Sequence, residues 1–222
     1  DAWVKVSKHL LENGVKVGNL TEELNVVTEI TEFKSDNWFD GHFREIMGDD
    51  RIDFAKTVTF LQPEEKKSDN PFFEEEKGLD YKFIKDHYHQ SYWGRMVSWR
   101  GEFNQIENVI KILSTGKAVK RCELIIFDPT KDARNPYSQP CMCMIDLKPR
   151  NGKLYLTSVL RSNRVSKSGY ADYTALTEMG HFLAEQSGLE LGKVTTLACS
   201  CHIGDMDNEK KKTIKLLEVL NK

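Results

Sequence analysis

The segment from Cys141 to Ser162 constrains the fold more than any other part of the chain. Two runs rich in apolar and β-branched residues, CMCMIDL and KLYLTSVLRS, flank the linker KPRNG. An Asn-Gly pair between two such runs is typical of a tight hairpin, because both residues tolerate a positive φ. Asn151 and Gly152 therefore predict an antiparallel pair of strands, around which any sheet of this chain must be built.

Helices and further strands are expected on both sides of this hairpin. Apolar residues recur at helical spacing in the segments 2–12, 102–116, 171–188 and 208–222. In the second of these the expected inner face is Phe103, Ile106, Val109, Ile110 and Leu113. Strands are expected at 24–33, 122–127 and 193–203. This order of elements, with antiparallel neighbours, predicts an α+β fold.

The chain length favours one domain. Its 222 residues are 39% hydrophobic, which is enough for a sizeable core without disulfide bonds. A charged stretch around 62–82, interrupted by Pro63 and Pro71, is expected to be a surface excursion. We therefore expect a single domain over 1–222.

Charge and cysteine content limit the partners and the compartment. The net charge of −2 argues against a broad electrostatic surface for nucleic acid or anionic membranes. No run approaches eighteen consecutive apolar residues, so no membrane-spanning helix is expected. Five cysteines are an odd number, and no secretory segment is visible, which favours a reduced, cytoplasmic protein.

Two Cys-x-Cys pairs raise the question of a metal. Cys141 and Cys143 form the first pair, Cys199 and Cys201 the second, and His202 follows directly. Residues i and i+2 of a strand share a face, so these side chains could meet a zinc ion, although zinc sites usually space their cysteines more widely. The simpler alternative is that cysteines such as Cys122, Cys143 and Cys199 are small core residues.

Cys141 differs from the others because it follows Pro140 at the mouth of a strand. A nucleophilic cysteine needs a nearby cation that stabilises its thiolate. Arg161 lies across the predicted hairpin from Cys141 and is a candidate for that cation.

The order of motifs resembles the thymidylate synthase superfamily, which includes the pyrimidine nucleotide hydroxymethylases. The resemblance is carried by QPCMCMIDLKPRNGKLYLTSVLRSNRV, GYADYTALTEMGHFLAEQSGLELG and CHIGD, with weaker matches in YWGRMVSW, NQIENVIKIL and KAVKRCELIIFDP. The convincing part runs from Tyr92 to Asp205. It implies a twisted mixed β-sheet with flanking helices, and a homodimer whose sheets pack back to back.

The resemblance implies a role for each matched residue. Cys141 matches the nucleophile that adds to carbon 6 of the pyrimidine. Arg161 and Ser162 match the phosphate-binding Arg-Ser, and that guanidinium could also lower the thiol pKa. Lys120 and Arg121 match basic residues that reach the partner subunit's phosphate. His202, which could equally be a satisfied strand histidine, matches the sugar-binding histidine.

Asp172 lies eleven residues after Arg161, where thymidylate synthases carry the Asn that reads uracil. Deoxycytidylate hydroxymethylases also carry Asp there. A carboxylate can accept a hydrogen bond from the cytosine amino group, so the resemblance favours a cytosine nucleotide. The alternative is a helix N-cap, a position at which Asp is also preferred.

Three departures concern the folate and the sugar. Arg164 stands where the family has a pterin-binding Asp, and Gly204 stands where a Tyr touches the ribose. The sequence given ends at LEVLNK, without the family's longer tail. The resemblance still places Trp93, Arg164 and Gly169 at folate-binding positions. For the proton-relaying acid, Asp53 is the candidate, with Glu45 as a second.

The expected function is transfer of a one-carbon unit from 5,10-methylene-tetrahydrofolate to carbon 5 of CMP or dCMP. A covalent adduct of Cys141 would carry the reaction, and the product would be the 5-hydroxymethyl nucleotide. The alternatives are a short archaeal type of thymidylate synthase that converts dUMP to dTMP, a nucleotide-binding paralogue without covalent chemistry, and a cysteine-histidine zinc protein.

Overall fold

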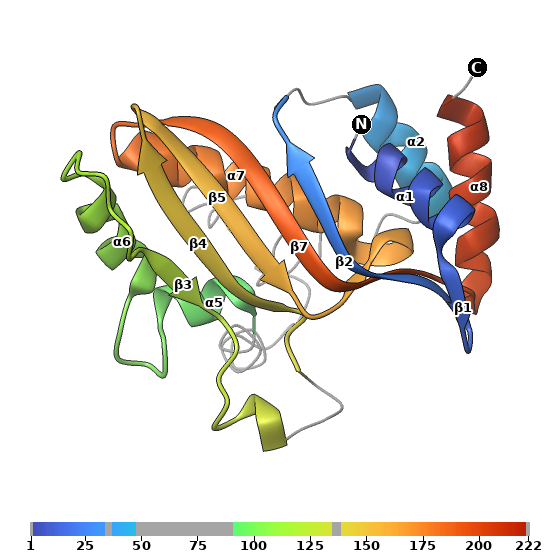
Figure 1. Ribbon diagram of the computed structural model, residues 1–222, viewed down its shortest axis with the longest axis horizontal. Coiled ribbons are helices and arrows are strands. Elements are labelled where there is room, and N and C mark those ends of the chain that lie inside the picture. Colours follow the sequence, from blue (N-terminus) through green and yellow to red (C-terminus); the bar gives the residue numbers. More distant parts are fainter. Residues whose placement is uncertain (1, 34–36, 48–90, 135–138, 221–222) are drawn as a thin grey trace, which may run out of the picture.

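A seven-stranded mixed sheet organises the protein (Figure 1). The computed structural model describes residues 2–33, 37–47, 91–134 and 139–220. The sheet order is β1-β2-β7-β5-β4-β3, and the short β6 pairs with β7. The strands are β1 (Val15–Val17), β2 (Leu20–Ile30), β3 (Glu123–Ile125), β4 (Met142–Arg150), β5 (Lys153–Leu160), β6 (Asn163–Arg164) and β7 (Glu190–Gly204).

The hairpin expected from Asn151 and Gly152 is confirmed. Strands β4 and β5 pair antiparallel from Arg150 and Lys153 outward. Asn151 has φ 51° and Gly152 has φ 75°, the positive values that this turn requires. Strand β7 joins β5 in parallel, because the chain crosses back through the long helix α7 (Tyr170–Gln186).

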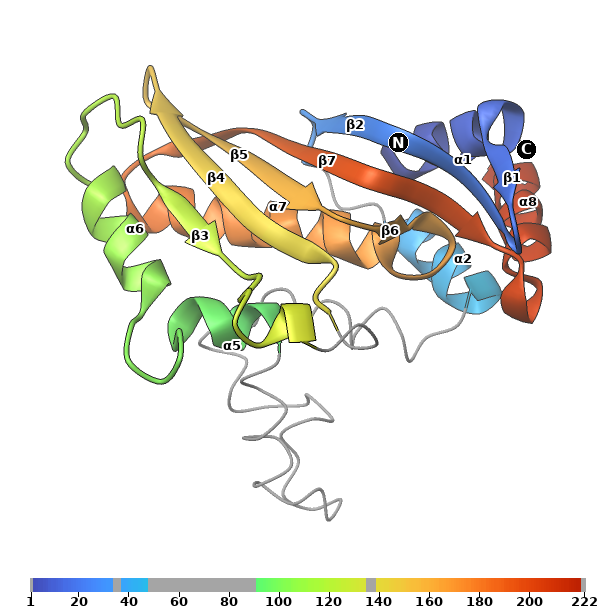
Figure 2. The ribbon, with the colours of Figure 1, turned by 60° about the horizontal axis from the view of Figure 1, so that its bottom comes forward.

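Helices α5 (Tyr92–Val97), α6 (Gln105–Leu113) and α7 lie along one face of the sheet, below it in Figure 2. Their apolar side chains and those of β3, β4, β5 and β7 form the main core. This arrangement confirms the predicted α+β class. Short helical segments connect these elements: a 3₁₀ turn at Asp132–Arg134, a π-helical turn at Val165–Gly169 and a 3₁₀ turn at Met206–Asn208.

A second apolar cluster lies at the β1 and β2 end of the sheet. Helices α1 (Ala2–Asn13), α2 (Asn37–Met47) and α8 (Glu209–Leu220) gather there (Figure 1). The rings of Phe39 and Phe43 lie 5.9 and 5.2 Å from the Trp3 ring, both edge-on. The Trp3 indole N–H donates to the Val165 carbonyl at 2.9 Å, which ties α1 to the start of the π-helical turn.

Some expectations needed correction. Phe103 lies outside α6 and is 49% exposed, because the helix begins two residues later with Asn104 as its N-cap. Cys199 is exposed rather than part of the core. The expected excursion at 62–82 lies outside the described residues. None of the helices in the described part of the chain has the length and hydropathy of a membrane span.

Candidate active site

Cys141 lies directly before β4, and Arg161 lies directly after the paired strand β5. The Arg161 backbone N–H donates to the Cys141 carbonyl at 2.8 Å, which places the two residues side by side. Arg161 Nε donates to the Pro140 carbonyl at 2.9 Å, and Nη2 donates to the Gln139 carbonyl at 2.8 Å. Nη2 is 3.8 Å from the Cys141 sulfur. The cation that the sequence predicted for Cys141 is therefore in contact with it.

Tyr92 and Asp172 complete the surroundings of the thiol. The Tyr92 hydroxyl accepts hydrogen bonds from the backbone N–H groups of Cys141, at 3.1 Å, and Met142, at 3.4 Å. Burial raises the pKa of the Cys141 thiol, the Arg161 guanidinium lowers it, and the nearby Asp172 carboxylate raises it. Asp172, in the first turn of α7, is only 7% exposed. The net pKa of Cys141 lies above that of an ordinary thiol, because burial and one negative charge outweigh the cation.

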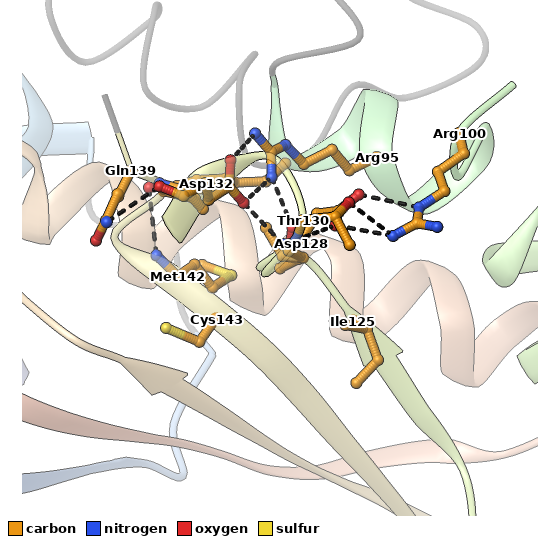
Figure 3. A network of polar contacts seen from close by, with 12 residues as sticks. Arg95, Arg100, Ile125, Asp128, Thr130, Asp132, Gln139, Met142 and Cys143 are labelled. Atoms are coloured by element: carbon orange, nitrogen blue, oxygen red, sulfur yellow. Dashed lines mark hydrogen bonds and ion pairs between the residues drawn. The ribbon is translucent and has the colours of Figure 1, made fainter. Parts of the chain in front are cut away.

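A network of ion pairs holds the chain that leads to Cys141 (Figure 3). Arg95 of α5 binds the Asp132 carboxylate with both terminal nitrogens, at 2.6 and 3.0 Å, and also donates to the Ile126 carbonyl. The Asp132 carbonyl accepts a hydrogen bond from the Gln139 side chain at 3.1 Å. Since Arg161 donates to the Gln139 carbonyl, the network connects α5 with the guanidinium group that lies beside Cys141.

Asp128 links this network to the surface. Its backbone N–H donates to Asp132 at 2.7 Å, while its carboxylate accepts from Arg100 at 2.9 and 3.0 Å. Hydrogen bonds from Arg100 hold the pKa of Asp128 far below its usual range, against the effect of burial. Burial by itself would raise the pKa of Asp132, but hydrogen bonds from Arg95 and from the Asp128 N–H lower it. Both carboxylates therefore stay ionised at neutral pH. The sequence did not reveal the two ion pairs, because Arg95 and Asp132 are 37 positions apart and Arg100 and Asp128 are 28 positions apart.

His202 lies further along the sheet, on β7. The register of the parallel strands places Arg164 of β6 directly beside it. The His202 side chain is 8% exposed, and its Nδ1 is 3.4 Å from the Ser200 hydroxyl. Burial lowers the pKa of His202, and the positive charge of Arg164 lowers it further, so the imidazole is neutral at pH 7.

The remaining predicted substrate residues take different positions. Ser162 lies between Arg161 and β6 and is partly buried. Lys120 and Arg121 are exposed just before β3, at the end that pairs with the far part of β4. From Cys141 to Leu147 is six residues, or roughly 20 Å of strand, so this chain does not bring the two basic side chains to its own Cys141.

The residues predicted as the proton-relaying acid and as folate ligands lie in different parts of the chain. Asp53 lies outside the described residues, and Glu45 is exposed on α2. Trp93 is 4% exposed and packs in the main core, 6.4 Å from the Phe182 ring. Gly169 is buried near the Asn163 side chain. The folate-binding role of Trp93 therefore stays a prediction.

Asp40 on α2 lies near the start of α7. Its carboxylate accepts from Tyr170 at 3.2 Å and from Arg44 at 2.7 Å. Tyr170 stands two residues before Asp172. Asp40 is thus a described carboxylate at the start of α7, which the sequence did not single out.

The cysteines do not converge on a metal. Among the described residues, no group of three or more His, Cys, Asp or Glu side chains is arranged to hold a metal ion. Cys122 and Cys201 are buried, which raises their pKa values to about 11 and about 12 and keeps both thiols neutral.

Comparisons with known proteins point to one family. A family model described as thymidylate synthase matches residues 28–217. A protein of Methanococcoides burtonii named "Putative thymidylate synthase" is 33% identical over 126 residues, which cover 56% of this chain and 58% of that protein. A protein of the same name from Methanosarcina mazei is 32% identical over 117 residues, covering 53% of this chain and 54% of its own length. The matches thus span little more than half the length of these two relatives.

A longer match at lower identity comes from Methanothermobacter marburgensis. Its protein, which has the same curated name, is 24% identical over 223 residues, covering 97% of this chain and 94% of the relative. Cys141, Arg161, Asp172 and His202 all lie inside the segment that the family model matches.

Proposed function

Because this chain belongs to the thymidylate synthase family, we propose that it transfers a one-carbon unit to carbon 5 of a cytidine monophosphate and forms the 5-hydroxymethyl nucleotide. The observation that carries the proposal is the meeting of three groups. Cys141 supplies a thiol, Arg161 lies 3.8 Å from its sulfur, and the charge of Asp172 is close enough to act on that thiol. A nucleophile, a cation and a base-reading carboxylate are the groups that this reaction needs.

The first step is addition of the Cys141 thiolate to carbon 6 of the pyrimidine. The sulfur–carbon bond forms, and the electrons of the 5,6 double bond make carbon 5 nucleophilic. Arg161 stabilises the thiolate, while burial and Asp172 oppose it in the free protein. A cytosine that donates its amino N–H to Asp172 disperses that negative charge. Base binding therefore lowers the thiol pKa at the moment when the nucleophile is needed.

In the later steps neither the nucleotide nor the folate is oxidised or reduced. The proposed donor is 5,10-methylene-tetrahydrofolate, the co-substrate of the family, which when bound supplies a methylene group at the oxidation level of formaldehyde. Carbon 5 forms a bond to that methylene group and loses its proton to a base in the site. The carbon–nitrogen bonds that hold the methylene group to the folate break, their electron pairs stay on nitrogen, and tetrahydrofolate leaves an exocyclic methylene on carbon 5. Water then adds to the exocyclic methylene carbon, and the sulfur of Cys141 leaves carbon 6 with its electron pair. No hydride moves.

Asp172 favours cytosine over uracil on simple hydrogen-bonding grounds. An ionised carboxylate only accepts, whereas the uracil edge presents a carbonyl oxygen where cytosine presents an amino group. Two acceptors facing each other at a site only 7% exposed would repel each other. We therefore expect discrimination against uracil nucleotides.

A homodimer is part of the same proposal. On the sheet face opposite α7, the pairing register aligns apolar side chains across five strands: Val27, Leu197, Val159, Met144 and Ile125. Val27 is 59% exposed and Ile125 is 39% exposed. An exposed apolar row of this kind is typical of an interface. A second copy packed on it could also bring the exposed Lys120 and Arg121 to the partner's nucleotide phosphate.

A thymidylate synthase is the second candidate, and the curated names of the relatives favour it. That reaction would methylate dUMP and oxidise the folate to dihydrofolate. The formation of dihydrofolate separates the two reactions, because hydroxymethylation returns tetrahydrofolate.

The test is release of tritium from carbon 5 of labelled CMP, dCMP and dUMP, with and without methylene-tetrahydrofolate. Release from a cytosine nucleotide is expected, and it should be abolished in Cys141→Ala. Cys143→Ala, two residues away in β4, is the matched control and should retain the release. Release from dUMP alone, together with dihydrofolate, would transfer the assignment to thymidylate synthase. Binding of nucleotides without release from any of them would indicate a binding paralogue.

A further inference from the structure

Gly204, the last residue of β7, lies against a guanidinium group. A Cβ atom built on Gly204 would be 2.5 Å from Arg164 Nη2, 2.8 Å from Arg164 Nε and 2.7 Å from Glu209 Oε2. Contacts this short cannot be accommodated without moving the neighbour. The Arg164 guanidinium therefore occupies the space in which any side chain at 204 would begin.

Arg164 is held there through one edge. Its Nε donates to Glu209 Oε2 at 2.9 Å. The same carboxylate oxygen accepts from the Ser166 hydroxyl at 2.6 Å, and that hydroxyl accepts from the Gly204 N–H at 3.0 Å. The side chain of Glu209 is 5% exposed, whereas that of Arg164 is 25% exposed. The acid is thus a buried anchor, and the cation is the part that solvent reaches.

The terminal nitrogens of Arg164 are left without hydrogen-bond partners among the residues that the structure describes. A guanidinium fixed at Nε keeps its two terminal nitrogens as a parallel pair of donors. His202 lies on the same face of β7 as Gly204, since residues i and i+2 of a strand share a face, and the strand register sets it beside Arg164. Arg164 and the neutral imidazole therefore face the same space.

We infer that Arg164 binds the sugar of the nucleotide and selects a ribose that carries both its 2′- and 3′-hydroxyl groups. The inference rests on the proposed function and on the resemblance by which His202 matches the family's sugar-binding histidine. A pair of parallel donors is satisfied by two neighbouring oxygen atoms, which the ribose diol supplies and a 2′-deoxyribose does not. With the deoxy sugar, one donor loses water without gaining an acceptor. Gly204 and Glu209 are positioning residues, since the first leaves room for the guanidinium and the second fixes it.

The test compares ribo and deoxy nucleotides on two different bases. Dissociation constants for CMP, dCMP, UMP and dUMP are measured by titration calorimetry on the full chain. We expect CMP to bind at least about tenfold more tightly than dCMP, and UMP more tightly than dUMP by a similar factor, which is the size of one charge-assisted hydrogen bond. If the ratio of the deoxynucleotide to the ribonucleotide dissociation constant is the same for cytosine and for uracil, the protein selects the sugar independently of the base.

The principal variant is Arg164→Met with Glu209→Gln, which removes the cation without leaving a buried charge. In this double variant the ratio of the deoxynucleotide to the ribonucleotide dissociation constant should fall to about one. In Gly204→Ala the arginine is retained but displaced, so the ratio should fall as well; this second variant keeps the test decisive if the double variant does not fold. Arg161→Met is the matched control, because loss of the proposed phosphate ligand should weaken all four nucleotides and leave the ratio unchanged.

Two outcomes would overturn the inference. A ribo-to-deoxy ratio near one in the unmodified protein, or a ratio that survives in both Arg164→Met/Glu209→Gln and Gly204→Ala, would refute it and leave the proposed function intact. If none of the four nucleotides binds the unmodified protein, the proposed function fails together with the inference.

Discussion

Replacing Asp132 by Asn tests whether the network beside Cys141 is structural. The Asp132 carboxylate accepts two hydrogen bonds from Arg95, at 2.6 and 3.0 Å, and one from the Asp128 N–H at 2.7 Å. The side chains of Asp132 and Arg95 are 5% and 14% exposed, so solvent screens the pair little. In Asp132→Asn one acceptor oxygen becomes an amide donor that faces another donor, and the Arg95 charge loses its counterion.

The cost follows from these contacts. Hydrogen bonds to charged groups contribute about 1.5–3 kcal/mol each. Two of the three end on Oδ2 and can be retained if the amide oxygen takes that position, so one bond and the Arg95 counterion are lost, and we expect a loss of about 2–4 kcal/mol of unfolding free energy. For a chain of this size the midpoint of thermal unfolding should fall by about 5–15 °C. Urea unfolding followed by far-UV circular dichroism at pH 7 measures the change. Asp205→Asn, at an exposed position, is the matched control and should change stability by less than about 0.5 kcal/mol.

The pH dependence provides a second criterion. The pKa of Asp132 is lowered in the folded state, so its contribution is fully present above the unfolded pKa of about 4 and is lost as pH falls through the folded value. The stability difference between Asp132→Asn and the unmodified protein should therefore shrink as the pH falls below about 4. A loss under about 1 kcal/mol at pH 7, or a difference that does not decrease in acid, would refute the reasoning.

The remaining predictions concern the thiol, the strand end and the open sheet face. The rate of Cys141 alkylation by iodoacetamide should continue to rise above the pH range in which an ordinary thiol ionises, because the pKa of Cys141 is raised. Arg161→Met should slow this alkylation about 3- to 10-fold at pH 8, because it removes the cation that lowers the thiol pKa. Gly204→Ala should lower the unfolding free energy by about 1–3 kcal/mol, whereas Gly41→Ala, in open space on α2, should raise it by about 0.5–1 kcal/mol, both measured by urea unfolding. Leu197→Glu should weaken the proposed dimer at least about 100-fold, measured by light scattering over a dilution series.

Each of these has a control. The exposed Cys199 provides an internal reference for alkylation, and its rate should not respond to Arg161→Met. Val15, 68% exposed on β1 at the sheet edge, is the control for the interface, and Val15→Glu should leave the oligomeric state unchanged. If Gly204→Ala were as stable as the unmodified protein, the Arg164 guanidinium could not be packed against Gly204 as described. A stable dimer of Leu197→Glu would exclude the apolar row as the interface.

The sequence alone determined the features that depend on neighbouring residues. Asn151 and Gly152 set the hairpin, because a tight turn depends on the φ values that two adjacent residues can adopt. Apolar spacing located α1 and α6, since helical periodicity is visible within a dozen residues. The motif around Cys141 and Arg161 likewise needed only the hairpin to bring its two members together. The six-residue helix α5 was missed, because so few residues carry little periodicity, and α2 was missed although it is longer than α6.

Only the tertiary structure decided how each side chain is paired and how deeply it is buried. Tyr92 reaches the backbone at Cys141 from 49 positions away, and Glu209 fixes Arg164 from 45 positions away. Cys199 and Cys201 belong to one motif, yet one is exposed and the other is buried against a distant helix cluster. Partners and burial are set by contacts between remote segments, to which local propensity contributes little. The groups that surround Cys141 and Arg164 therefore became visible only after the sheet had brought those segments together.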